Sequence, residues 1–241
     1  MNAPRHARLV PAWLLHHRPW SDSSRVLELV TRPHGRISLF AHGARRPKSP
    51  WRALLRPFQP LLVSWSGRAD GGTLTGAESV GRAPALARDL LLAGFYLNEL
   101  LLRLLPREEP HERVFDAYGT ALAALAAVQD HAPLRAFERV LLEELGYGIE
   151  LGVEAAGGTL DPERYYHFEP GRGLLAVQDA AGADVYRGRD LIALARGELA
   201  EPRALAAARR IYGAAIAHCL EGRGLASREV MLAMRRREHG E

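Results

Sequence analysis

The sequence contains a single cysteine, Cys219, among its 241 residues. One thiol cannot form an internal disulfide, and it cannot supply the four cysteines, or two cysteines with two histidines, of a structural zinc site. Long apolar runs are also missing. The longest, residues 90–105, is interrupted by Asn98, Glu99 and Arg103, whereas a membrane span needs about 18 to 20 apolar residues. The basic N-terminus leads into no apolar segment with a cleavage site, so we expect no signal peptide and a cytoplasmic protein.

Acidic residues are scarce in the first third of the chain. Residues 1–82 hold 13 Arg or Lys but only four Asp or Glu, a net charge of +9, whereas residues 83–241 hold 19 basic and 24 acidic residues, a net charge of −5. A bias of the genome toward arginine explains why 31 of the 32 basic residues are Arg. It does not explain the lack of acids. The charge split therefore predicts a polyanionic partner for the first third.

Motifs that accompany catalysis are missing as well. The sequence has no Walker loop, no GxGxxG, no HExxH and no GxSxG. Its ten histidines are scattered, and its adjacent acids, such as Glu143 and Glu144, fall on expected helix exteriors, where acids are usually solvated. We therefore expect a protein that is not an enzyme, with no catalytic residues, no metal site and no cofactor.

The first 82 residues have the pattern of short strands. Apolar runs at 7–16, 25–31, 35–43, 61–65 and 73–80 are separated by turn clusters such as Asp70-Gly71-Gly72. In 35–43, Ile37, Leu39 and Ala41 alternate with polar residues. Five strands in about 80 residues favour a small closed barrel of the OB type, with an SH3-like barrel as the alternative. We expect residues 1–82 to form a nucleic-acid-binding domain.

Helical periodicity takes over after residue 82. Helices are expected at 85–105, 112–130, 134–146, 190–198, 202–221 and 227–236. Residues 155–187 are turn-rich, and 174–177 with 184–186 are expected to form a small β-hairpin. The expected fold class is therefore α+β, with a five-stranded OB-fold barrel followed by a mainly α-helical domain over residues 83–241.

The connection between the third and fourth strands is the most informative stretch. Residues 44–59 hold five cations and two aromatic residues but no acid, and their centre is expected to form one or two helical turns. Single-stranded nucleic acid needs cations for its phosphates and flat groups on which its bases stack. Trp65 is interpreted as barrel core, with base stacking as the alternative, and Phe58 is interpreted as a core residue. The predicted DNA-binding residues are Arg36, Arg45, Arg46, Lys48, Trp51, Arg52, Arg56 and Arg68.

Several segments, in the same order and at the same spacing, resemble the bacterial RecO family of DNA repair proteins in its proteobacterial form. The resemblance covers nearly the whole chain. Its segments include LHHRPWS at 15–21, AHGAR at 41–45, LRPFQPLL at 55–62, GFYLNELL at 94–101, LRAFE at 134–138 and LGYG at 145–148.

This resemblance implies a recombination mediator with an N-terminal OB-fold and a helical C-terminal domain. Such a protein binds single- and double-stranded DNA, anneals complementary strands and, with RecR and in many bacteria RecF, helps load RecA onto strands covered by single-strand-binding protein (SSB). It further implies a cytoplasmic, nucleoid-associated location. The family contacts the acidic C-terminal tail of SSB, which implies a site at Arg135, Phe137, Arg139 and Leu141. Some members carry a four-cysteine zinc module that Cys219 alone cannot form.

The residues themselves leave two other functions open. One is an OB-fold protein that binds RNA or DNA in another process, such as translation. The other is a nuclease that uses the barrel as a targeting module, although the basic third lacks the clustered carboxylates expected of it.

Overall fold

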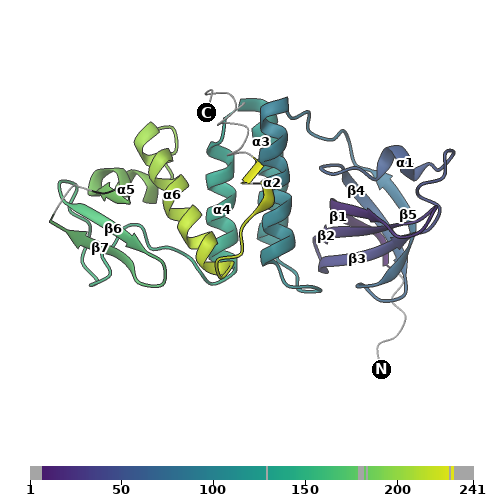
Figure 1. Cartoon of the computed structure of the whole chain (residues 1–241), viewed down its shortest axis with the longest axis horizontal. Coiled ribbons are helices and arrows are strands. Elements are labelled where there is room, and N and C mark those ends of the chain that lie inside the picture. The colour runs from purple at the N-terminus through teal and green to yellow at the C-terminus, as the bar shows by residue number, and fades with distance from the viewer. Residues whose placement is uncertain (1–6, 129, 179–181, 183, 228, 231–241) are drawn as a thin grey trace. The chain divides into compact units, whose positions relative to one another are not determined.

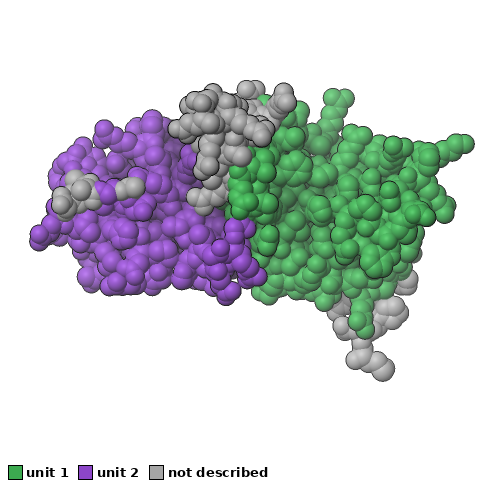
Figure 2. Space-filling view, viewed as in Figure 1, with its two compact units in different colours: residues 1–129, 225–241 green, residues 130–224 purple. Residues whose placement is uncertain are grey.

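The computed structural model describes residues 7–128, 130–178, 182, 184–227 and 229–230. Chain contacts divide it into two compact units, coloured separately in Figure 2. Unit 1 comprises residues 1–129 and 225–241, and unit 2 comprises residues 130–224. Unit 1 contains a β-barrel with helices α2 and α3, and unit 2 contains α4, α5, α6 and a small sheet (Figure 1).

The barrel confirms the expected architecture of the first 82 residues. Its strands close in the order β1-β2-β3-β5-β4, and only the β3–β5 pair is parallel. The long strand β1 pairs with both β2 and β4, which closes the barrel. The strand bounds are β1 (Ala7–Pro19), β2 (Arg25–Thr31), β3 (Gly35–Ala41), β4 (Pro60–Ser66) and β5 (Gly72–Ser79), with the short helix α1 (Trp51–Leu54) between β3 and β4.

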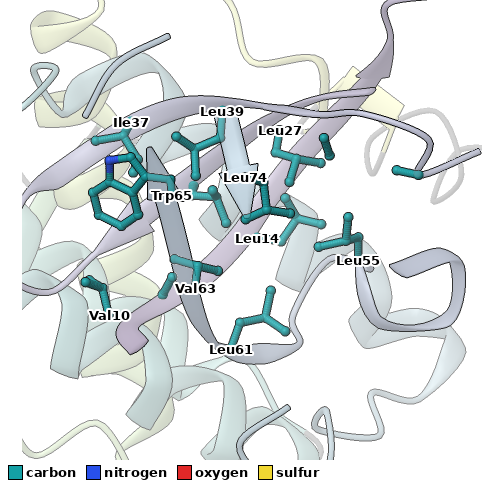
Figure 3. Close-up of a cluster of buried hydrophobic side chains, with 14 of the residues drawn as sticks. Val10, Leu14, Leu27, Ile37, Leu39, Leu55, Leu61, Val63, Trp65 and Leu74 are labelled. Carbon is teal, nitrogen blue, oxygen red and sulfur yellow. The ribbon is translucent and has the colours of Figure 1, made fainter. Parts of the chain in front are cut away.

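Side chains that alternate along the strands fill the barrel interior (Figure 3). Ile37, Leu39 and Ala41 of β3 are all buried, as their spacing predicts. They belong to one hydrophobic cluster with residues of β1, β2, β4 and β5. Trp65 is 1% exposed and belongs to the same core, which confirms its interpretation as a core residue. Phe58 is also buried, with its ring 5.1 Å from that of Phe95 on α2. Burial of each such side chain stabilises the fold by about 1.5 to 3 kcal/mol.

Helices α2 (Arg88–Leu104) and α3 (Glu112–Val128) pack against the barrel at β1. The Trp13 ring packs edge-on against Tyr118, with centroids 5.4 Å apart, and a Cβ on Gly119 would lie only 3.0 Å from the indole. The buried amide of Asn98 donates a 2.7 Å hydrogen bond to the Leu15 carbonyl and accepts one of 2.5 Å from the Tyr118 hydroxyl. Burial raises the pKa of Tyr118, so the hydroxyl keeps the proton that it donates.

Unit 2 corrects one expectation from the sequence. Residues 174–177 and 184–186 do not pair with each other, because a strand that the sequence analysis missed, β6 (Tyr165–Glu169), lies between them. The sheet order is β7-β6-β8, with β7 (Gly173–Val177) and β8 (Val185–Arg187) each antiparallel to β6. A hairpin is present, but its arms are β6 and β7. The helices of this unit are α4 (Ala132–Glu144), α5 (Gly188–Ala195) and α6 (Pro202–Cys219).

The compact units do not end where the sequence suggests a domain boundary. Chain contacts place α2 and α3 with the barrel, so unit 1 extends to residue 129 and resumes at residue 225. The division into 1–82 and 83–241 stays a prediction. The helix expected at 227–236 is only partly covered, because residues 228 and 231–241 lie outside the described residues.

Candidate nucleic-acid interface

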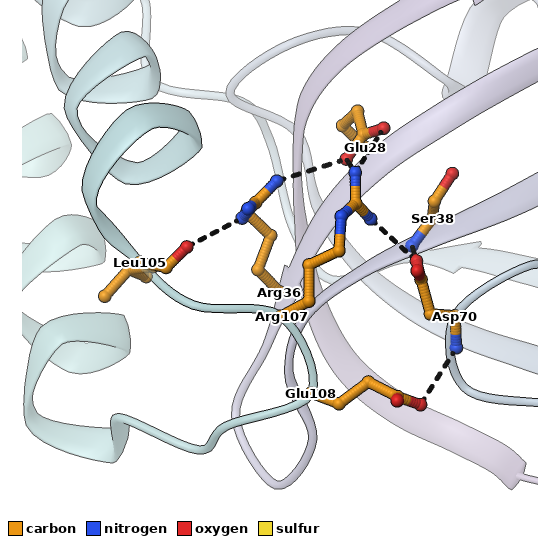
Figure 4. A network of polar contacts seen from close by, with 7 residues as sticks. All are labelled: Glu28, Arg36, Ser38, Asp70, Leu105, Arg107 and Glu108. Carbon is orange, nitrogen blue, oxygen red and sulfur yellow. Dashed lines mark hydrogen bonds and ion pairs between the residues drawn. The ribbon is translucent and has the colours of Figure 1, made fainter.

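Arg36 is held in a network of polar contacts at the start of β3 (Figure 4). Its Nε donates a 3.0 Å hydrogen bond to the Leu105 carbonyl, and its Nη1 lies 3.7 Å from Glu28. Arg107 donates from Nη2 to both Glu28 oxygens, at 3.1 and 3.0 Å, and lies 2.7 Å from Asp70 through Nη1. Burial, followed by the nearby Arg107 charge, lowers the pKa of Arg36. The Arg36 guanidinium therefore makes its contacts within the protein and stabilises the fold.

This network fixes residues 105–111, the α2–α3 connection, against the barrel. β5 pairs with β3 only at Leu39 and Phe40, so the first half of the β3 edge is left without a strand partner there. The Glu108 N–H donates to the Arg36 carbonyl at 3.0 Å and covers part of this edge. Gly35 adopts φ +65° and lies so close to the connection that a Cβ would fall 1.9 Å from the Glu109 carbonyl oxygen. This end of the β2–β3 surface is therefore filled by the protein itself.

A different set of side chains lies toward the other end of β3. Arg18, Val26 and Phe40 are cross-strand neighbours on β1, β2 and β3. Trp20, in the 20–24 connection between β1 and β2, is 56% exposed as a residue. Its ring meets that of Phe40 edge-on, with centroids 5.2 Å apart. The Arg18 Cζ lies 5.9 Å from the Trp20 ring. This end therefore presents aromatic and cationic groups together, as nucleic-acid surfaces do.

Arg45 joins the basic connection to this end of the barrel. Its backbone N–H donates to the Ser23 carbonyl at 2.9 Å, and its Nη1 donates to the Ser21 carbonyl at 2.7 Å. The 42–59 connection is thus attached to the 20–24 connection, and Arg45 remains exposed. Of the predicted DNA-binding residues, Arg45 thus lies beside the connection that carries Trp20. Arg36 lies apart from it, in the polar network at the start of β3.

The remaining predicted cations are exposed. Among the described residues, none of them forms an ion pair within 4.0 Å with an acidic group, in contrast to Arg32, which meets Glu112 at 2.7 Å and Asp116 at 3.1 Å. Trp51 is different, since it is half-buried and packs on the barrel core. Its ring therefore holds α1 against the barrel and is less available for stacking with a base. The exposed cations are Arg46, Lys48, Arg52, Arg56 and, in the connection between β4 and β5, Arg68.

The residues assigned to the SSB tail lie on α4 in unit 2. Phe137 and Leu141 are almost fully buried, so they support this helix from within the unit instead of forming its surface. The Arg135 side chain is only 10% exposed and its Nη2 lies 2.8 Å from the buried Glu138 carboxylate. Arg139 is more exposed and lies 3.4 Å from Glu143. The accessible part of this region is therefore the edge of Arg135 together with Arg139.

The described residues hold neither a group suited to a metal ion nor a helix suited to a membrane. No group of three or more His, Cys, Asp and Glu side chains there has an arrangement that could hold a metal ion. None of the helices in the described part of the chain has the length and hydropathy needed to cross a membrane.

Comparison with known proteins identifies the family. Residues 9–82 match the family model "Recombination protein O N terminal" and residues 86–229 match "Recombination protein O C terminal". The DNA repair protein RecO of Alkalilimnicola ehrlichii is 46% identical over 221 residues, which cover 90% of this chain and 88% of that protein. The chain belongs to the RecO family of DNA repair proteins. The RecO proteins of Nitrosococcus oceani and Methylococcus capsulatus are 44% and 43% identical and cover 95% and 94% of this chain and 94% of each relative.

Membership of the RecO family confirms several expectations. The barrel is the OB-fold domain of the family, and the chain has a role in DNA repair and recombination. The prediction that it is not an enzyme is also confirmed, because the proteins of this family are DNA repair proteins without a catalytic activity of their own.

Sequence reasoning missed part of the candidate interface. It did not select Arg18, Trp20 or Phe40. The signal for Phe40 was present, because Arg36, Ser38 and Phe40 occupy the outward positions of β3. The distant hydrogen-bond partner of Arg36, in contrast, could not be found from local pattern, because Leu105 lies 69 positions further along the chain.

Proposed function

We propose that this RecO-family protein binds single- and double-stranded DNA on the barrel surface formed by the 20–24 and 42–59 connections, and that it anneals complementary strands there. The exposed cations of the 42–59 connection, a segment without an acidic residue, carry this proposal. Arg45 also attaches this segment to the 20–24 connection, in which Asp22 is the one acid. Arg36 and Trp51 are left out of the proposed contact surface because their side chains serve the fold.

Annealing needs no covalent bond to be made or broken. Two strands repel each other through their phosphates, and a cationic surface lowers this repulsion by replacing condensed counterions. Phosphate contacts carry no sequence information, so binding at this surface should tolerate any sequence and weaken steeply with salt.

The proposed partners follow from family membership. With RecR, and with RecF where it is required, the protein would help load RecA onto SSB-coated DNA in the cytoplasm, in association with the nucleoid. The SSB tail would meet unit 2 at Arg135 and Arg139, where a guanidinium can pair with the carboxylates of the tail. Family membership favours this function over an RNA-binding protein or a nuclease with an OB module.

The test is annealing of two complementary labelled DNA strands, each covered by SSB, without added nucleotide. We expect the protein to accelerate annealing on strands covered by intact SSB and to lose most of this effect with SSB that lacks its tail. Binding to bare strands without any annealing would overturn the mediator function and leave only a DNA-binding barrel.

A further inference from the structure

We propose that Trp20 and Phe40 form a stacking platform for an unpaired base, and that this platform makes the barrel prefer single-stranded over double-stranded DNA. The proposal rests on the proposed function, since it assumes that the barrel binds DNA. It adds the residue that distinguishes the two forms of the ligand.

The geometry of Trp20 is the first argument. An indole is among the most favourable groups to bury, yet 56% of Trp20 is exposed. Its ring is held edge-on against Phe40, with an interplanar angle of 67°. In an edge-on contact, the edge of one ring lies against the face of the other. This contact fixes the orientation of the indole. An oriented and exposed aromatic ring is the feature that base stacking requires.

The support beneath the rings is the second argument. Val26 faces away from the barrel core, between Arg18 and Phe40 in the strand register, yet it is 1% exposed. The outer surface is therefore well packed at this point, and Phe40 in turn lies near His42, with ring centroids 6.5 Å apart. Phe40 thus stands on β3 beside the buried Val26 of β2, so the platform does not depend on the 20–24 connection alone.

The charges around the platform identify the occupant. The Arg18 guanidinium lies near the Trp20 ring, and Arg45 is anchored to the Ser21 and Ser23 carbonyls of the same connection. Cations beside an exposed ring match the phosphates and bases of a nucleic acid. In a duplex the bases are stacked on each other, so only phosphates reach this surface. In a single strand a base can turn out and stack on the indole.

The test compares three short ligands of the same length: a single strand with bases, a single strand of abasic nucleotides, and a duplex. Affinities of the full chain and of Trp20→Ala are measured by fluorescence anisotropy at one salt concentration. We expect Trp20→Ala to weaken binding of the base-bearing strand by about tenfold, within a range of about 5- to 150-fold. Its affinity for the abasic strand and the duplex should change less than about twofold.

Two further variants make the result specific. Trp20→Phe keeps a ring and should retain most of the single-strand affinity. Tyr147→Ala removes an aromatic side chain of similar exposure, 50% against 56% for Trp20, from unit 2 and should change none of the three affinities. Thermal unfolding of each variant checks that the fold is unchanged.

The outcomes separate the two proposals. Equal loss on all three ligands, or no loss on any, would overturn the stacking platform. If the unaltered protein binds the three ligands equally, the platform fails while DNA binding by the protein stands. If the unaltered protein binds none of them, the proposed function fails as well.

Discussion

Removing Arg45 and Arg46 is the sharpest perturbation of the proposed DNA surface. Both side chains are exposed and, among the described residues, neither is paired with an acid. For single strands, the logarithm of the binding constant falls with the logarithm of salt concentration by about 0.7 for each neutralised phosphate. If each guanidinium neutralises one phosphate, Arg45→Ala with Arg46→Ala should make this slope shallower by about 1.4.

The change in slope can be converted to an affinity. The counterion contribution vanishes toward about 1 M salt, so a slope change of about 1.4 corresponds to roughly 10- to 15-fold weaker binding near about 0.15 M salt. Charge reversal, Arg45→Glu with Arg46→Glu, should weaken binding further because the glutamates repel the phosphates. We would measure anisotropy of a labelled single strand over a salt series, and thermal unfolding to confirm the fold.

The matched control removes the same charge elsewhere. Arg164→Ala with Arg196→Ala takes two exposed cations from unit 2 and lowers the net charge by the same amount. This control should leave the salt slope unchanged. An unaltered slope in the Arg45 and Arg46 variant, or an equal change in the control, would refute the reasoning, because binding would then follow net charge or another surface.

Three other predictions address the fold and the second unit. Asn98→Ala removes the buried hydrogen bonds that its amide makes with the Leu15 carbonyl and the Tyr118 hydroxyl. It should lower the free energy of unfolding by about 2 to 4 kcal/mol in urea titrations, and a loss below about 1 kcal/mol would contradict this prediction. Burial of the imidazole, together with neighbouring positive charges, lowers the pKa of His17. As the pH falls below about 6.5, the unfolded chain therefore takes up a proton at this side chain before the folded chain does. The free energy of unfolding decreases over this range and levels off once the pH is below the lowered pKa. Between about pH 7.5 and 5.5, His17→Asn should therefore lose less free energy of unfolding than the unaltered chain or the His218→Asn control. Equal losses in all three proteins would show that His17 does not cause the pH dependence. Arg135→Ala should weaken binding of an SSB-tail peptide more than binding of bare DNA, with Arg164→Ala as control, and equal effects on both ligands would remove Arg135 from the tail site.

Local pattern was sufficient for the barrel strands but not for their assembly. The alternation of Ile37, Leu39 and Ala41 predicts a strand with one buried face, which the structure confirms. The closure of β1 onto β4 and the parallel β3–β5 pair depend on contacts between distant segments, which periodicity does not encode. The missed strand β6 does alternate, with Tyr166 and Phe168 buried, but it lies between turn clusters that favoured a loop interpretation.

The candidate interface shows the same limit. Exposed cations in the acid-free connection were predictable from composition, because acids were absent nearby in sequence. Arg36 looks equivalent in sequence, yet Glu28 and Leu105 bring it into a structural network. Trp20 was passed over because a lone aromatic residue in a polar turn indicates neither core nor surface. Only its contact with Phe40 shows that it is held in place while exposed.

The central claim is that DNA lies on the barrel surface formed by the 20–24 and 42–59 connections. A single strand that carries photoreactive bases, cross-linked to the full chain and mapped by mass spectrometry, tests it most directly. The account predicts cross-links at Trp20, at Phe40 and within the 42–59 connection, and their loss in high salt. Cross-links confined to unit 2, or to the α2–α3 connection around Arg107, would contradict it.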